Sequence, residues 1–318
     1  MKVISDFRGH YDDALERNFN YEQYGDDCTE RIFMHGQGWT EFPHGRSEFN
    51  DYSYKVTFNY EQPCAWQMAN NIEFMYKSAD SANLFDKIHT ICPYSAKWLN
   101  EKRGLEKFIT AIIPYPESHI PEKAVEKEFD VLYWGAVHNQ HHLDMLDVFE
   151  NYNHNFLTLG FEYWGIRNPD YIKFITAQNL PRAKMWDIMR KTKITLCSNL
   201  LYLKPESAHA AKQIEGWQDN EALHRVDDHI MPQMKTRPLE AIMNRSLLLI
   251  LRDPWNVVEE FFEPEKEFIY YDDKKDLEEK VDEITKNWEK YEHITEAAYQ
   301  KAINNYTTKH LFNAISKN

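Results

Sequence analysis

Residues 235–240 combine two cations and a carboxylate at the start of a predicted helix. Lys235 and Arg237 flank Thr236, and Glu240 follows Arg237 by three residues, which places both of these side chains on one helical face. Cations oppose the dipole of a helix N-terminus, so their presence there makes sense if a bound anion completes the site. Backbone N–H groups and a guanidinium together suit a diphosphate, and a glutamate accepts hydrogen bonds from ribose hydroxyls. The pattern predicts a nucleotide site.

Alternating strands and helices surround these residues in the C-terminal half of the sequence. Short apolar runs predict strands at 129–134, 155–160, 172–176, 193–197, 246–251 and 268–271. Apolar residues at three-to-four spacing predict helices at 141–152, 181–191 and 232–243, a short helix near 256–262, and a helical tail from Lys275 onward. This strand–helix–strand rhythm is typical of a parallel sheet with helices on its faces.

The N-terminal part of the chain shows the same rhythm. Strands are predicted at 2–6, 31–35, 54–60, 88–92 and 108–113, with helices at 64–78 and 94–103. The stretch PYPESHIPEKAVEKEFD then brings three prolines and a cluster of charges, which is typical of a linker. We therefore predict an N-terminal domain at 1–115, a linker at 116–127, a C-terminal domain at 128–292, and a C-terminal helix at 293–318.

Polar residues follow two of the predicted strands. Gly135, His138 and Asn139 form a turn after strand 129–134, at the kind of position where parallel α/β sheets bind ligands, so we expect them near a bound phosphate. Asn199 follows strand 193–197, and Tyr202 lies in the polar stretch 200–230, which we interpret as a long active-site loop with a possible short helix. A zinc site built from His138, His141 and His142 is a weaker alternative, because adjacent histidines rarely converge on one ion.

Composition narrows the class of protein. Hydrophobic residues make up 42% of the chain, yet no apolar run approaches the roughly 20 residues that span a bilayer. The N-terminus has no signal-peptide pattern and the four cysteines are scattered, so we expect a cytoplasmic protein with reduced thiols. The formal net charge of −14 disfavours a nucleic-acid partner. One basic stretch is interpreted as the solvated face of a helix: Arg182, Lys184, Arg190, Lys191 and Lys193.

The pattern from Arg237-Pro-Leu-Glu240-Ala through SLLLIL to EEFFEPEKEFIYYDD resembles the C-terminal domain of GT-B glycosyltransferases, in particular the spore-maturation (CgeB-like) branch. The resemblance is best over residues 180–312. It implies an α/β fold of two Rossmann-like domains facing across a cleft, in which Arg237 or Lys235 contacts the donor diphosphate and Glu240 contacts the ribose. The terminal YTTKHLF resembles a final helix that packs back on the N-terminal domain. The chain departs from the family pattern at Glu265, where the family has a glycine.

This resemblance implies transfer of a sugar from a nucleotide diphosphate sugar to a hydroxyl-bearing acceptor. The chain has no D-x-D motif, so we expect cationic side chains and helix dipoles, rather than a metal, to meet the phosphate charge, and we expect no cofactor. Two alternatives stay open. One is a phage-type transferase that acts on modified DNA bases, and the other is a non-catalytic nucleotide-binding protein with the same scaffold.

The acceptor side of such an enzyme falls on the N-terminal domain. His10 follows the first predicted strand, and with Asp12 to orient it this histidine is the candidate general base of an inverting reaction. Arg8 lies in the same loop, and Glu61 follows the predicted strand 54–60. We expect Arg8 and Glu61 to contact the acceptor.

Overall fold

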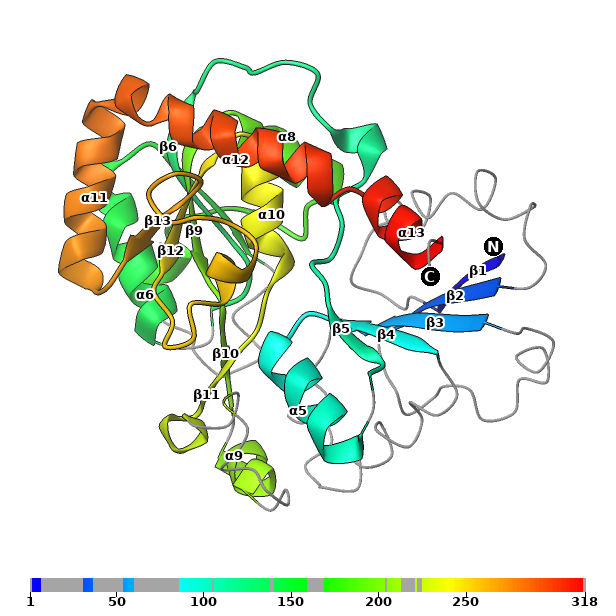
Figure 1. Ribbon diagram of the computed structural model, residues 1–318. Helices are drawn as coiled ribbons and strands as arrows, with labels where there is room; N and C mark the ends of the chain where they lie inside the picture. The colour runs from blue at the N-terminus through cyan, green and yellow to red at the C-terminus, as the bar shows by residue number, and fades with distance from the viewer. Residues whose placement is uncertain are drawn as a thin grey trace. The chain divides into compact units, whose positions relative to one another are not determined.

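The computed structural model (Figure 1) describes residues 2–6, 31–36, 54–59, 86–104, 106–137, 140–158, 169–203, 205–212, 221 and 225–316. The chain divides into two compact units. One comprises Met1–Ile113, Leu200–Lys235 and Ile315–Asn318, and the other comprises Pro114–Asn199 and Thr236–Ala314. The helix predicted at 64–78 lies outside the described residues.

The second unit is built on a six-stranded parallel sheet. Its strands lie in the order β13-β12-β9-β6-β7-β8, and each pairs with its neighbours in parallel. Numbered along the unit, this is the doubly wound order 3-2-1-4-5-6, with the switch in direction between β6 and β9. The predicted α/β class is confirmed. The bounds are β6 (Phe129–Trp134), β7 (His154–Thr158), β8 (Ile175–Gln178), β9 (Thr192–Ser198), β12 (Leu247–Leu251) and β13 (Ile269–Tyr271).

Helices cover both faces of this sheet (Figure 1). On one face α10 packs against α8, α12 and strand β12, and on the other α11 packs against α6 and strand β13. Apolar residues of α11 at three-to-four spacing, Leu277, Val281 and Ile284, supply its buried stripe, and the Asp273 carboxylate accepts from the Asp276 N–H at 2.9 Å to cap its start. The helices are α6 (Gln140–Asp147), α7 (Pro169–Ile172), α8 (Arg182–Arg190), α10 (Thr236–Met243), α11 (Lys274–Lys286), α12 (Glu292–Asn305) and α13 (Thr308–Ser316).

Single turns of 3-10 helix complete the second unit. They are η3 (Glu117–His119), η4 (Val148–Asn151), η9 (Val257–Glu260) and η10 (Trp288–Lys290). The turn before β13 contains Glu265, the residue that stands where the family pattern has a glycine. Its φ is 63°, and its N–H donates to the Phe268 carbonyl oxygen at 2.8 Å. The turn therefore keeps the left-handed geometry that glycine adopts most easily.

The first unit contains a five-stranded parallel sheet in the order β1-β2-β3-β4-β5. Helix α5 (Pro93–Arg103) connects its last two strands and packs on β5. The strand bounds, all close to those predicted, are β1 (Lys2–Asp6), β2 (Arg31–Gly36), β3 (Tyr54–Asn59), β4 (Lys87–Thr90) and β5 (Phe108–Thr110).

The stretch that we interpreted as a long loop with a possible short helix, residues 200–230, contains a helix and also begins and ends in short strands, so the loop interpretation is wrong in part. Strands β10 (Leu200–Tyr202) and β11 (Ile230–Pro232) pair antiparallel. Between them lie helix α9 (Pro205–Lys212) and the 3-10 turn η8 (Val226–Asp228). Leu200 and Met231 are buried, which explains why such short strands hold together.

The segment predicted as a linker runs along the second unit and contacts several of its helices. Directly before it, the Tyr115 hydroxyl lies 3.3 Å from Asn244 Oδ1 at the end of α10, and within it Pro121 O accepts a hydrogen bond from the Tyr299 hydroxyl at 3.1 Å. At the other end of the chain, α12 packs on α10. The packing of residues 293–318 on the N-terminal domain, like the domain boundaries themselves, stays a prediction.

Candidate functional site

The carboxyl ends of β6 and β9 define the candidate site, because the sheet order switches direction between these two strands. Strand β6 ends at Trp134 and continues into Gly135, whose N–H donates to Leu157 O at 3.0 Å. Gly135 has a φ of 139°, and a Cβ at this position would lie 2.5 Å from Cζ of Arg237. Glycine therefore provides the space in which the guanidinium group of Arg237 lies against the backbone.

Arg237 lies in the first turn of α10 and reaches the end of β6. Its Cζ is 5.0 Å from the centroid of the Trp134 ring and 5.9 Å from that of the Tyr133 ring, within the range of cation–π attraction. Arg237 is half-buried and has no carboxylate partner among the residues that the structure describes. A cation that lies at a helix N-terminus without a counter-charge is suited to bind an anion.

Tyr133 stabilises the turn on which Arg237 rests. Its hydroxyl donates to Ala136 O at 2.8 Å, just beyond Gly135. Burial raises the pKa of Tyr133 to about 12, so the hydroxyl remains a donor at neutral pH. The turn after β6 is thus held by a side-chain hydrogen bond as well as by the bond from Gly135 to Leu157.

Glu240 lies one turn further along α10 and is 3% exposed. Its Oε1 forms an ion pair with Nη1 of Arg182, which is 7% exposed. Its Oε2 is also buried and has no hydrogen-bond partner among the described residues. The site therefore contains one buried carboxylate oxygen that is paired and one that has no hydrogen bond among the described residues.

Arg182 was missed by the sequence analysis. We expected it on a solvated helix face with Lys184 and Arg190, and for Arg182 this is wrong, because its side chain is buried and its Cζ lies 5.1 Å from the Trp134 ring. A signal was present. Arg182 precedes Met185 and Trp186 by three and four residues, and these two, with Met189, form the buried stripe of α8.

The other predicted donor-site residues have the following positions. Lys235 is half-buried, and its Nζ donates to Leu200 O at 2.6 Å. Thr236 is the first residue of α10 and is half-buried. Asn199 is buried directly after β9, and Tyr202 is the last residue of β10. The remaining predicted site residues, Arg8, His10, Asp12, Glu61, His138 and Asn139, lie outside the described residues.

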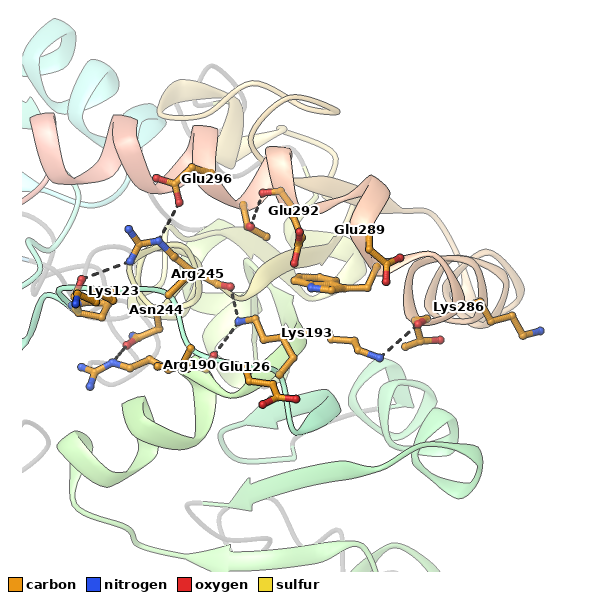
Figure 2. Close-up of a pocket in the computed structure, with 17 residues that line it drawn as sticks. Lys123, Glu126, Arg190, Lys193, Asn244, Arg245, Lys286, Glu289, Glu292 and Glu296 are labelled. Atoms are coloured by element: carbon orange, nitrogen blue, oxygen red, sulfur yellow. Dashed lines mark hydrogen bonds and ion pairs between the residues drawn. The ribbon is translucent and has the colours of Figure 1, made fainter.

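A cavity of about 570 Å³ lies at the opposite edge of the same sheet, beside the segment 121–127 (Figure 2). Its charged side chains are largely satisfied within the protein. Arg245 Nε pairs with Glu296 at 2.9 Å, and Lys193 Nζ pairs with Asp130 at 2.9 Å. Because its wall contains charges of both signs that neutralise one another, this cavity is a weaker candidate for an anionic ligand than the end of β6.

Lys127 is one of the residues that line this cavity. Its Nζ donates to Arg190 O at 2.8 Å and to Arg245 O at 2.7 Å, at the C-terminal ends of α8 and α10. Burial, with Arg245 nearby, lowers the pKa of Lys127 to about 7, whereas the two carbonyl groups favour its ammonium form. These contacts give Lys127 a structural role in joining two helices.

Within the described ranges, no group of three or more His, Cys, Asp or Glu side chains is arranged to hold a metal ion. No helix in the part of the chain that the structure describes is long and apolar enough to cross a membrane.

Several solved structures have a similar fold, among them three that were determined with UDP bound. A variant of TarM from S. aureus, in complex with Fondaparinux, alpha-GlcNAc-glycerol and UDP, is 11% identical with a TM-score of 0.54, over 89% of this chain and 54% of that one. The pneumococcal O-GlcNAc transferase GtfA, in complex with UDP and GlcNAc, is 10% identical with a TM-score of 0.51, over 97% and 60%. HepE from Anabaena, in complex with UDP, is 8% identical with a TM-score of 0.53, over 96% and 80%.

The chain thus matches between 54% and 60% of the length of the TarM and GtfA chains. At these identities the likeness shows the fold alone. Curated protein sequences give no match. The model of one protein family, described as glycosyl transferase-like, matches residues 123–317, which include the whole doubly wound sheet and every residue of the Trp134–Arg237–Glu240 cluster. The protein belongs to this glycosyl transferase-like family.

Proposed function

We propose that the protein transfers a glycosyl group from a nucleotide diphosphate sugar to a hydroxyl-bearing acceptor. The observation that carries this proposal is the arrangement at the end of β6. The guanidinium of Arg237 lies against Gly135 and Trp134 without a carboxylate partner among the described residues, and the buried Oε2 of Glu240 has no hydrogen bond there. An anion and a hydroxyl group on one ligand satisfy both. UDP in the TarM, GtfA and HepE complexes has both.

In this reaction the acceptor oxygen forms a bond to the anomeric carbon of the sugar while the bond from that carbon to the diphosphate breaks. Negative charge then develops on the leaving diphosphate. In this proposal Arg237 and the N–H groups at the start of α10 stabilise this charge, and a preorganised donor of this kind typically contributes about 100- to 1,000-fold in rate. We assign Lys235 and Thr236 to the same diphosphate as part of the proposal, and the ribose hydroxyls to Glu240.

The finer assignments extend this proposal. His138 and Asn139 belong with Gly135 near the diphosphate, and Asn199 and Tyr202 near the nucleotide or sugar. On the acceptor side, His10 with Asp12 takes the proton from the acceptor hydroxyl, and Arg8 and Glu61 bind the acceptor. We further propose that transfer needs no metal. Donor turnover that is lost with EDTA and restored with Mg²⁺ would overturn this last point.

Nucleotide titration tests the donor site directly. UDP, GDP and ADP are titrated into the wild type and into Arg237→Gln. We expect one diphosphate to bind, and the variant to bind it about 10- to 100-fold more weakly because a charge-assisted contact is lost. Arg245→Gln is the matched control, since Arg245 also lies on an aromatic ring, Tyr299, but at the opposite edge of the sheet. Its affinity should equal that of the wild type.

The corresponding nucleotide sugars then separate catalysis from binding. A glycosyltransferase hydrolyses its donor slowly without acceptor, so release of the diphosphate from one donor sugar is the expected result. Binding without any turnover, with or without a panel of hydroxyl acceptors, would support the non-catalytic alternative. A wild-type protein that binds none of the three diphosphates would overturn the proposal.

A further inference from the structure

We propose that Arg182 is a positioning residue of the donor site, which holds Glu240 so that one carboxylate oxygen is reserved for a ribose hydroxyl. This inference rests on the proposed function, because it assigns the hydroxyl to the ribose of a nucleotide. It adds a residue from a second helix, α8, to a site otherwise built from α10 and the end of β6.

The geometry fixes Glu240 through one oxygen. Arg182 Nη1 donates to Glu240 Oε1, and both side chains are more than nine-tenths buried. Arg182 is itself fixed, because it begins α8 on the same stripe as the buried Met185 and Trp186, and its guanidinium lies 5.1 Å from the Trp134 ring. The carboxylate of Glu240 therefore has little freedom to rotate, and its second oxygen has a defined direction.

The second carboxylate oxygen of Glu240 indicates that the ion pair belongs to a binding site. A buried ion pair is weak support for stability, since apolar side chains of similar size often stabilise a core as well or better. Here the pair also leaves Glu240 Oε2 buried without a hydrogen bond among the described residues, which costs free energy as long as nothing satisfies it. A ligand hydroxyl that donates to Oε2 removes this cost. The pair is thus better explained as part of a binding site than as a core contact.

Arg182 and Arg237 have different tasks although both lie about 5 Å from the Trp134 ring. Arg182 is paired with Glu240, whereas Arg237 has no carboxylate partner among the described residues. Loss of Arg237 should therefore weaken binding of the diphosphate itself. Loss of Arg182 should instead weaken the distinction between a ribonucleotide and its deoxy forms.

The experiment measures that distinction. The probes are the diphosphate among UDP, GDP and ADP that binds the wild type, and its 2′-deoxy and 3′-deoxy forms. We expect the wild type to bind the ribonucleotide about 10- to 100-fold more tightly than at least one deoxy form, as for a hydrogen bond to a charged group. Arg182→Gln should reduce this ratio to within about threefold of unity while it retains most of the affinity for the deoxy form. The ratio of two dissociation constants does not change with the fraction of folded protein.

Three further variants complete the test. Glu240→Gln and the double variant R182Q/E240Q should show the same small ratio as R182Q, because the two residues act through one oxygen and their effects do not add. Arg182→Lys keeps the charge and should recover part of the ratio. Arg182→Met, which removes the charge, serves in place of R182Q if R182Q does not fold. Arg190→Gln, at the other end of α8, is the control and should keep the wild-type ratio.

Each outcome has one meaning. A wild-type ratio in R182Q or, if that variant does not fold, in R182M overturns the positioning role of Arg182. A wild type that binds the diphosphate but shows no preference for the ribonucleotide overturns the assignment of Oε2 to the ribose, and it leaves the diphosphate site intact. Failure of the wild type to bind any of the three diphosphates is the separate failure of the proposed function.

Discussion

Substitution of Gly135 by alanine is the sharpest perturbation of the candidate site, because it adds one methyl group where the structure has no space for it. The new Cβ would lie 2.5 Å from Cζ of Arg237 and 3.0 Å from its Nη1. Ordinary contacts between such atoms begin near 3.4 Å. The guanidinium must therefore move away from the backbone by about 1 Å, and an arginine can do this by rotating its side chain.

The expected cost has three parts, of which two lower the free energy of unfolding and one lowers the affinity for the nucleotide. The φ of 139° is one that alanine rarely adopts, and such a conformation costs about 1–3 kcal/mol in the free energy of unfolding. The displaced guanidinium loses part of its attraction to Trp134, about 0.5–2 kcal/mol. It also loses alignment with the diphosphate that we propose, where a charged hydrogen bond contributes about 1.5–3 kcal/mol, or roughly a 10- to 100-fold change in affinity.

A double-mutant cycle separates these parts. Gly135→Ala, Arg237→Ala and the double variant are compared by urea unfolding and by nucleotide titration. In the Arg237→Ala background no guanidinium remains to clash, so Gly135→Ala should cost only the backbone strain and should change affinity no further. Gly104→Ala is the control, since Gly104 also has a positive φ, 59°, but a Cβ at that position would meet no described atom within 4 Å. It should lower stability without affecting the nucleotide.

Two results would contradict this account of Gly135. If Gly135→Ala binds the diphosphate as tightly as the wild type while Arg237→Ala does not bind it, the contact between Gly135 and the guanidinium does not position Arg237. Equal costs of Gly135→Ala in both backgrounds would likewise show that the clash is absent.

Three further predictions concern stability. Lys127→Met removes two charge-assisted hydrogen bonds to the ends of α8 and α10 and should lower the free energy of unfolding by about 1–3 kcal/mol, whereas an unchanged urea midpoint would contradict that role. Burial lowers the pKa of His89 from 6.5 in the unfolded chain to about 4 in the folded protein. The neutral ring therefore contributes fully to stability above the unfolded pKa, and this contribution is lost as the pH falls from the unfolded pKa to the folded one. Between about pH 7.5 and about pH 4.5 the wild type should therefore lose about 2.5 kcal/mol more of its free energy of unfolding than His89→Gln does. A difference between the two proteins that stays constant with pH would refute this. Glu265→Gly relieves a positive φ and should raise stability by roughly 0.5–1 kcal/mol, so a loss of stability on unfolding by urea would be inconsistent with strain at this turn.

The parallel sheets could be predicted from sequence because their strands are continuous apolar runs. FDVLYW and SLLLIL correspond to β6 and β12, and such runs are typical of strands that are covered on both faces. Strands β10 and β11 were missed because three residues are too few to show a period of two. The strand predicted at 172–176 begins later, at Ile175, because the preceding apolar residues belong to α7 and the turn after it.

The site could be predicted only in part. The helix position of Arg237 and Glu240 follows from local spacing, and the structure places both on α10. The strand order, which brings the start of α10 to the end of β6, depends on pairings between strands far apart in the sequence, and no local pattern specifies these. The partner of Glu240 lies 58 residues away, so residue spacing within α10 gives no sign of it.

Trp134 and Gly135 show why neighbouring residues at a strand end can organise side chains from distant helices. The tryptophan ring offers a surface to guanidinium groups from both α8 and α10, and the glycine leaves room for one of them against the backbone. Two arginines and one glutamate leave this cluster with an excess positive charge, at the positive end of the α10 dipole. The same interactions that hold the cluster together therefore leave it with this excess charge, and this is the physical basis on which we expect diphosphate affinity to depend on Arg237 and ribose recognition on Arg182.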